Sequence, residues 1–278
     1  MINPLFVTLN LNFNSEMRHR STILFLLAVL SISSMAQVTD TVNITDSKGL
    51  KQGHWIKKDQ AGRIQYDGYF KDDKPTGTFK RFYNNGKLQS LMTFSSDGKS
   101  ADAEFYHTNG LKAAKGKYIN QLKEGRWQFF SSFLEDYLIS EEEYRNNRRN
   151  GLSVKYFPNK NPSEKLTYVN DVKTGEWLQY YASGKIFIRA NFAAGKLQDK
   201  FSVYYEDGKP QYLGQYKNDI RDGIWVKYDR NGNEITRITY INGLAINPEI
   251  YIKETQYLDS LERNRGKIAD PEKTGTIW

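Results

Sequence analysis

Residues 175–185 read GEWLQYYASGK, and nearly the same phrase recurs at 223–232 as GIWVKYDRNG and at 77–87 as GTFKRFYNNGK. Steps of 24 residues give eight units, with two extra residues in the fourth. The units begin at Gly53, Gly77, Ala101, Gly125, Gly151, Gly175, Asp199 and Gly223. We number residues by their position within a unit, the first being position 0. Self-similarity at a fixed period is the sequence signature of a repeat architecture.

Aromatic residues keep this period. Position 17 is aromatic in all eight units, and positions 2 and 5 are aromatic in most of them. We expect the rings at positions 2 and 17 to hold neighbouring units together, because one unit alone cannot bury its apolar surface. These structural aromatics are Trp55, Phe70, Phe79, Phe94, Tyr118, Trp127, Tyr144, Tyr168, Trp177, Phe192, Tyr216, Trp225 and Tyr240.

Turn signals divide each unit into two strands. Positions 8 and 9 read Asn85-Gly86, Asn109-Gly110, Asp207-Gly208 and Asn231-Gly232. Such pairs between aromatic runs predict a β-hairpin with a type I′ turn, which needs positive φ at both residues. Paired positions then sum to 17, so that the ring at position 2 faces a residue at position 15 that is usually small. The fold class predicted is all-β, a tandem β-hairpin array forming an elongated single-layer antiparallel sheet.

A C-terminal helix is predicted over residues 246–266, followed by a tail at 267–278. Ile250, Tyr257, Leu258 and Leu261 recur at helical spacing, and Pro248 suits a first turn. Since open sheet edges invite pairing, we interpret this segment as a capping helix. A partner-binding helix is the alternative.

The N-terminal region has the pattern of an export signal. Arg18 and Arg20 precede the apolar run 23–30, and Ser34-Met35-Ala36 offers small residues for cleavage. We expect translation to start at Met17 and cleavage to follow Ala36. Residues 1–36 are then the N-terminal extension and the signal peptide. Residues 37–48 form the mature N-terminal segment, and residues 49–245 form the repeats. The protein is then exported, periplasmic or envelope-associated, with no transmembrane segment in the mature chain. An uncleaved anchor or a buried strand is the alternative, and the protein is cytoplasmic if the signal interpretation is wrong.

The amino-acid composition and the motifs limit the kinds of chemical site that the chain can form. The chain has 278 residues, no cysteine and a formal charge of +8, which excludes disulfides and thiolate ligands. We find no catalytic or phosphate-binding motif and expect no enzyme activity, no metal and no cofactor. His54 and His107 are expected to be structural or surface residues. The acids at 135–143 lack the alternating spacing of a calcium loop.

Basic residues recur between units, near positions 21 and 22. Seven of them could form one long basic edge that binds anionic lipid or glycan, whereas solubility of the connectors is the plainer interpretation. Nucleic acid is not an expected partner. The seven residues are Lys74, Lys99, Lys123, Arg149, Lys173, Lys196 and Arg221.

The repeat is irregular in its middle. Units four and five lack the turn glycine, and unit five has prolines at 158 and 162 that oppose regular strand pairing. Phe133, Leu134 and Tyr137 could form an exposed apolar knuckle that binds a protein partner. Sequence drift is the alternative.

The phrase GEWLQYYASGK followed by Phe192, and GIWVKYDRNG followed by Tyr240, resembles the MORN-variant repeat of proteins labelled YwqK-type antitoxins. The resemblance spans residues 49–245 and implies an open antiparallel array used for binding or scaffolding, with no catalytic residues. It leaves open whether the protein is an exported scaffold that binds another protein of the envelope or a cytoplasmic toxin-neutralising protein. Adhesion to anionic lipid or glycan is a third possibility, which salt would weaken.

Overall fold

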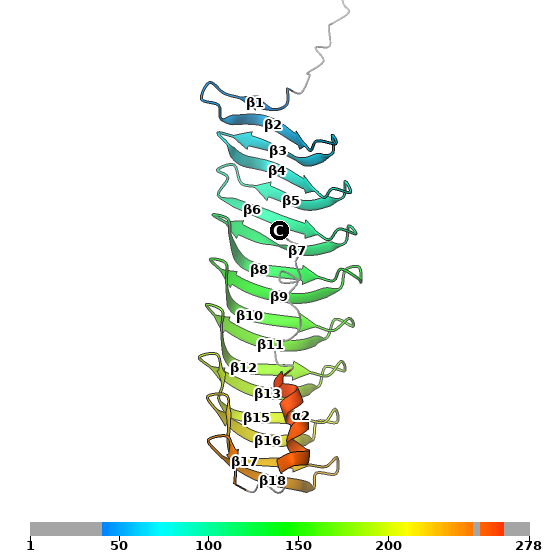
Figure 1. Cartoon of the computed structure of the whole chain (residues 1–278), viewed down its shortest axis with the longest axis vertical. Helices are drawn as coiled ribbons and strands as arrows, with labels where there is room; N and C mark the ends of the chain where they lie inside the picture. Colours follow the sequence, from blue (N-terminus) through cyan, green and yellow to red (C-terminus); the bar gives the residue numbers. More distant parts are fainter. Residues whose placement is uncertain (1–40, 247–250, 264–278) are drawn as a thin grey trace, which may run out of the picture. The chain divides into compact units, whose positions relative to one another are not determined.

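The computed structural model describes residues 41–246 and 251–263. This part of the chain is antiparallel β-sheet with one α-helix near its end (Figure 1). The elements are β1 (Ile44–Thr45), β2 (Lys51–Lys58), β3 (Ile64–Lys71), β4 (Lys74–Phe82), β5 (Leu88–Phe94), β6 (Ser100–Tyr106), β7 (Lys112–Ile119), β8 (Leu122–Phe130), β9 (Leu138–Arg145), β10 (Arg148–Tyr156), β11 (Pro162–Val169), β12 (Val172–Tyr180), β13 (Ile186–Ala193), β14 (Lys196–Leu197), β15 (Asp199–Tyr204), β16 (Pro210–Lys217), β17 (Ile220–Tyr228), β18 (Glu234–Ile241), β19 (Leu244–Ala245) and α2 (Tyr251–Arg263).

The strands form one open sheet and follow one another in chain order (Figure 1). Each strand pairs with the next, except that β13 pairs with both the short β14 and with β15. The described residues therefore hold nineteen strands in a single antiparallel sheet. This confirms the predicted all-β array of hairpin repeats.

The turn type predicted for the Asn-Gly sites is wrong, and the two-residue turns lie at the opposite edge of the sheet. At the Asn-Gly sites only the glycine has positive φ, 79° at Gly86 and 95° at Gly110, so these are not type I′ turns. The Gly86 N–H donates to the Tyr83 carbonyl, as in a type I turn followed by a left-handed glycine. Two-residue turns with positive φ at both residues lie at the other edge, for example at Asn170 (50°) and Asp171 (69°).

The predicted register nevertheless holds over most of each hairpin. Trp55 pairs with Gly68, and Trp177 pairs with Ala190, as positions that sum to 17 require. The register shifts by one residue next to the turn, between Lys57 and Lys58 in the first unit. A bulge there takes up the extra loop residue, which explains why a different turn gives the same pairing.

The large rings cover glycines of the preceding unit rather than those of their own hairpin. A Cβ added to Gly116 would lie 2.3 Å from the Trp127 ring, and one added to Gly214 would lie 2.2 Å from Trp225. These pairs join the second strand of one unit to the first strand of the next. Each ring therefore packs two units together through a backbone approach that only glycine permits.

The two faces of the sheet differ in chemistry. Positions 2, 15 and 17 lie on one face, which we call the aromatic face and which contains the buried clusters. Trp127, for example, makes an edge contact with Tyr144 at 6.5 Å between ring centroids. The opposite, mixed face carries partly buried position-5 rings among ion pairs such as Arg126–Glu141 at 3.1 Å. The aromatic face is the one that the array buries.

Helix α2 lies across the aromatic face near the end of the array (Figure 1). Leu258 is buried in the cluster that includes Trp225 and Tyr240, and Tyr257 stacks on Tyr212 at 5.8 Å. The predicted C-terminal helix is thus confirmed, and it covers a face of the sheet at this end of the array. The last pairing in the sheet is that of β18 with β19, and the helix instead covers a face whose rings would otherwise meet water.

The fifth unit is regular despite its prolines. Pro162 begins β11 and pairs with Tyr156, a strand-end position that needs no donor from proline. Lys160 takes the left-handed conformation, with φ of 69°, that glycine has in other units. The expected disruption of pairing is therefore wrong.

Several sequence predictions lie outside the described residues. These are the signal and its cleavage site within 1–36, the start of the segment 37–48, residues 247–250 and 264–266 of the predicted helix 246–266, and the tail 267–278. Within the described part, the helix spans Tyr251–Arg263 and residue 246 lies in a bend.

Tyrosines make the array sensitive to alkaline pH. Burial raises the pKa of Tyr118 to about 12. In the unfolded chain a phenol ionises at about pH 10, so the folded state holds this proton more tightly. The stability that it contributes is complete below pH 10 and is lost as pH rises through 12. We expect Tm to fall between pH 10 and 12, and to fall less steeply in Tyr118→Phe. A Tm in Tyr118→Phe that follows the wild type throughout this window would contradict this assignment.

Candidate functional site

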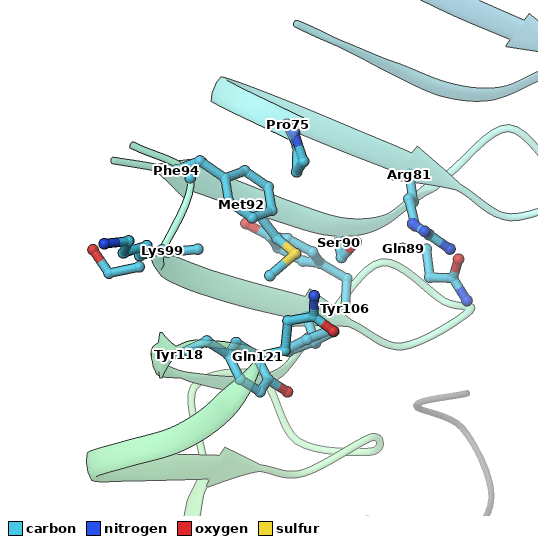
Figure 2. Close-up of a pocket in the computed structure, with 14 residues that line it drawn as sticks. Pro75, Arg81, Gln89, Ser90, Met92, Phe94, Lys99, Tyr106, Tyr118 and Gln121 are labelled. Carbon is cyan, nitrogen blue, oxygen red and sulfur yellow. The ribbon is translucent and has the colours of Figure 1, made fainter. Parts of the chain in front are cut away.

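The aromatic face has a pocket where the column of rings is interrupted. Unit three has Ala103 at position 2, where other units have tryptophan or phenylalanine, and Met92 pairs with it across the strands. Ala103 is buried, and beside it Met92 lines a pocket with a volume of about 520 Å³. The walls of the pocket also include Phe94, Phe105 and Tyr118 (Figure 2).

Polar groups surround this apolar pocket. Arg81 and Gln89 line it towards one end of the strands, and Lys99 lines it towards the other (Figure 2). Gln121 approaches from the turn between β7 and β8. The pocket thus combines apolar walls with polar and cationic groups at its margins, a composition typical of binding pockets.

Unit five is the second interruption, but polar side chains occupy it. Ser153 stands at position 2 and pairs with Glu142, which accepts a hydrogen bond from the Tyr144 hydroxyl at 2.8 Å. Nearby, Glu164 pairs with Lys155 at 2.9 Å. Burial opposes ionisation of Glu164, but Lys155 and two side-chain hydrogen bonds outweigh it, so the pKa of this carboxyl is lowered. The buried charge is therefore compensated and has a structural role.

Four of the seven cations of the predicted basic edge fold over the rings. The Lys123 ammonium lies 4.8 Å from the Trp127 ring centroid, and the Arg149 guanidinium lies 4.1 Å from that of Tyr168. Lys173 and Arg221 make equivalent contacts with Phe192 and Trp225. Only Lys74, Lys99 and Lys196 are exposed. The prediction of seven cations in one row is wrong, because alternation along the strand places most of them on the aromatic face.

Exposed charge at the two-residue turns occurs in separate pairs. Lys71 pairs with Lys74 across one turn, and Arg145 pairs with Arg148 across another. Aliphatic pairs take the same place in other units, namely Ile119 with Leu122 and Val169 with Val172. This edge therefore carries basic pairs, aliphatic pairs and the mixed pairs Ala193–Lys196 and Lys217–Ile220.

The loop between β8 and β9 presents two apolar side chains to solvent. Phe133 is 91% exposed and Leu134 is 51% exposed. Tyr137, the third member of the predicted knuckle, is partly buried, and its hydroxyl donates to the Tyr156 carbonyl at 2.7 Å. The structure thus brings Phe133 and Leu134 together as a surface and gives Tyr137 a structural role.

The histidines make ordinary structural contacts. His54 lies 2.7 Å from the Asp67 carboxylate and stacks on Tyr69. His107 contacts the Phe130 carbonyl at 3.2 Å, the bond that Tyr83 makes to Tyr106 in the preceding unit. The described residues contain no group of three side chains suited to a metal ion.

The pocket at Ala103 is the feature that sequence reasoning missed. The signal was present, because Ala103 is one of two non-aromatic residues at position 2. What the repeat pattern could not show is that polar side chains occupy the interruption at Ser153, whereas a pocket lies beside the interruption at Ala103, lined by Met92 and Phe105.

Within the described part of the chain, no helix has the length and apolar character needed to cross a membrane. A comparison with curated proteins finds no match. The family model described as MORN repeat variant matches residues 75–96, 149–170, 173–194 and 200–218. Those four matches fall on regular hairpins of the sheet, and the chain is therefore a repeat protein that carries repeats of the MORN variant.

Proposed function

We propose that the protein is a non-enzymatic, exported scaffold that holds a protein partner against its extended sheet, with Phe133 and Leu134 as the anchor. The repeat architecture supports a scaffold, since stacked hairpins give a long surface without a deep cleft. The observation that carries the proposal is the exposure of Phe133, 91%, on an ordered loop. Exposed aromatic anchors of this kind dominate the energetics of many protein interfaces.

Hydrogen bonds fix the shape of the loop. The Ser131 hydroxyl oxygen accepts bonds from the N–H groups of Phe133 and Leu134 at 3.0 and 3.1 Å. The Ser131 N–H in turn donates to the Tyr137 carbonyl at 2.9 Å. A loop held in this way loses little conformational entropy when a partner binds, which favours affinity.

The test is partner capture in the native host by chemical cross-linking after cell fractionation. The double variant Phe133→Ser/Leu134→Ser should lower the yield of the specific cross-linked species at least tenfold, as expected for loss of an interface anchor. Tyr137 is left unchanged because its hydroxyl supports the loop. Reading the N terminus of the captured chain tests export, for which the expected start is Gln37.

The matched control is Ile241→Ser/Leu244→Ser, which removes another exposed apolar pair, 56% and 75% exposed, from the last hairpin. Capture by this control should equal that of the wild type. Undiminished capture by the Phe133/Leu134 variant would rule out the anchor. An intact N terminus in the cytosol would overturn export and favour the toxin-neutralising alternative.

A further inference from the structure

Units two and five differ at one pair of facing positions on the aromatic face. In unit five, Lys155 at position 4 lies directly opposite Glu164 at position 13, and their side chains form an ion pair at 2.9 Å. In unit two, Arg81 lies directly opposite Ser90 at these same two positions. Unit two therefore keeps the cation of this pair and lacks the carboxylate.

The surroundings of Glu164 show how this geometry holds a carboxylate. The Trp177 indole N–H and the Gln179 side-chain amide, both from unit six, donate to it at 3.2 and 3.3 Å. Their equivalents in unit three are Ala103 and Phe105, whose side chains have no donor. The strand pairing of unit two thus presents a cation in the same register, with no carboxylate of the chain to receive it.

The polar groups in this part of the aromatic face are available to a ligand. Among the described residues that line the pocket of about 520 Å³, Arg81 and Lys99 are the charged ones, and neither forms an ion pair with another described residue. Ser90 also lines the pocket and is only 3% exposed, yet its hydroxyl has no hydrogen-bond partner in the described part of the chain. A guanidinium and a buried hydroxyl with unused donors suit an anionic acceptor from outside the chain.

Arg81 lies at one end of the pocket and Lys99 at the other (Figure 2). The Arg81 guanidinium carbon is 5.9 Å from the centroid of the Phe79 ring, which places it on the aromatic face. Because Ser90 faces Arg81 across the strands, the two side chains can donate to one carboxylate. Arginine is well suited to this role, since its fork of N–H groups matches the two carboxylate oxygens.

The remaining wall of the pocket is largely apolar. Met92 and Phe94 continue along β5 on the same face as Ser90, and they line the pocket. Phe105 and Tyr118 meet edge to face at 6.4 Å between ring centroids. The volume lies within the range of pockets that bind small organic molecules. The pocket therefore combines one carboxylate-binding end with a surface for an apolar body.

We infer that this pocket binds an organic carboxylate that has an apolar body. The carboxylate takes the place that the Glu164 carboxylate has in unit five and accepts hydrogen bonds from Arg81 and Ser90. The apolar body packs against the rings and the methionine. An aromatic acid and a fatty acid both have this chemistry. The site is separate from the loop of Phe133 and goes beyond the binding of a protein partner there.

Titration calorimetry on the full chain tests the ligand class with two carboxylates, a naphthalene carboxylate and octanoate. The matched neutral compounds are naphthalene methanol and octanol. Each carboxylate that the pocket accepts should bind at least about tenfold more tightly than its alcohol, because the alcohol cannot form charge-assisted hydrogen bonds. The tighter of the two carboxylates then distinguishes an aromatic acid from a fatty acid.

Variants test the placement of the carboxylate. Arg81→Met should weaken binding of the tighter carboxylate at least about tenfold. The matched control is Lys80→Met, which removes an exposed cation from the opposite face of the same strand and should leave binding unchanged. Ser90→Glu should abolish binding, because it supplies the carboxylate that unit five has at this position. Far-UV circular dichroism verifies that each variant is folded.

The inference would be overturned if neither carboxylate bound more tightly than its alcohol, or if Arg81→Met and Lys80→Met had equal effects. A larger loss in Lys99→Met than in Arg81→Met would overturn it as well, because the carboxylate would then lie at the other end of the pocket. None of these outcomes bears on cross-linking through Phe133, so the inference and the proposed function can fail separately.

Discussion

Replacing Gly116 by valine should lower the free energy of unfolding by about 3 kcal/mol, because the new side chain has no space. A Cβ at this position would lie 2.3 Å from Trp127, and that ring is only 1% exposed. The ring cannot rotate away without leaving the cluster that it forms with Phe129 and Tyr144. The measurement is urea unfolding followed by circular dichroism and by tryptophan fluorescence.

Gly125→Ala provides the control for this experiment. Gly125 has a φ of +68° and no atom within 4 Å of an added Cβ, so the substitution tests backbone strain alone. Its expected cost is about 1 kcal/mol, that of a left-handed non-glycine residue. If Gly116→Val cost no more than Gly125→Ala, close approach of the ring would not be the reason for the glycine.

Arg221→Met should lower the free energy of unfolding by about 3 kcal/mol and should expose α2 first. The Arg221 side chain is 9% exposed and bridges Asp259 and Glu262 at 2.8 and 2.9 Å. Removing the cation leaves two carboxylates against an apolar face. This loss of unfolding free energy is at the low end of the range for breaking a buried ion pair, because both carboxylates keep partial contact with water.

Hydrogen exchange of residues 251–263 distinguishes release of the helix from general destabilisation. In Arg221→Met these amides should exchange much faster, whereas those of β7 and β8 should change little. Arg237→Met is the matched control, since Arg237 makes an exposed pair with Glu234 in the same unit. Unchanged exchange in α2 of Arg221→Met would show that the helix is held by its apolar contacts alone.

Much of the fold could be predicted because the period of the rings specifies it. Eight aromatic residues at position 17 require one structural unit repeated eight times, and alternation along a strand places positions 2, 15 and 17 together. The turn type was mispredicted because Asn-Gly is compatible with two hairpin geometries. Both use glycine in the left-handed region, but they differ in loop length and in the conformation of Asn85 or its equivalent, which the sequence does not determine.

The site was less accessible to sequence reasoning, for two different reasons. The cations could have been placed correctly, because Lys123, Arg149 and Lys173 each stand two residues before position 0 and alternation puts them beside the rings. The pocket could not have been predicted, because it depends on how the neighbouring side chains pack. Met92 lies opposite Ala103, whereas polar side chains lie around Ser153. The periodicity of the sequence does not show how side chains fill space in three dimensions.

Hydrogen bonds along both edges of the sheet connect each hairpin to the next one. At one margin the Tyr181 hydroxyl donates to the Tyr204 carbonyl, and at the other the Asp171 N–H donates to the Arg149 carbonyl. The same two kinds of bond recur from unit to unit, for example from Tyr205 to Tyr228 and from Asn147 to Lys123, and most units are 24 residues long. Gene duplication or deletion of one whole unit therefore leaves every remaining hairpin with an equivalent neighbour. The two extra residues of unit four lie in the loop between β8 and β9, where the Tyr137 hydroxyl still donates to the Tyr156 carbonyl, so the insertion keeps the bond to the next unit.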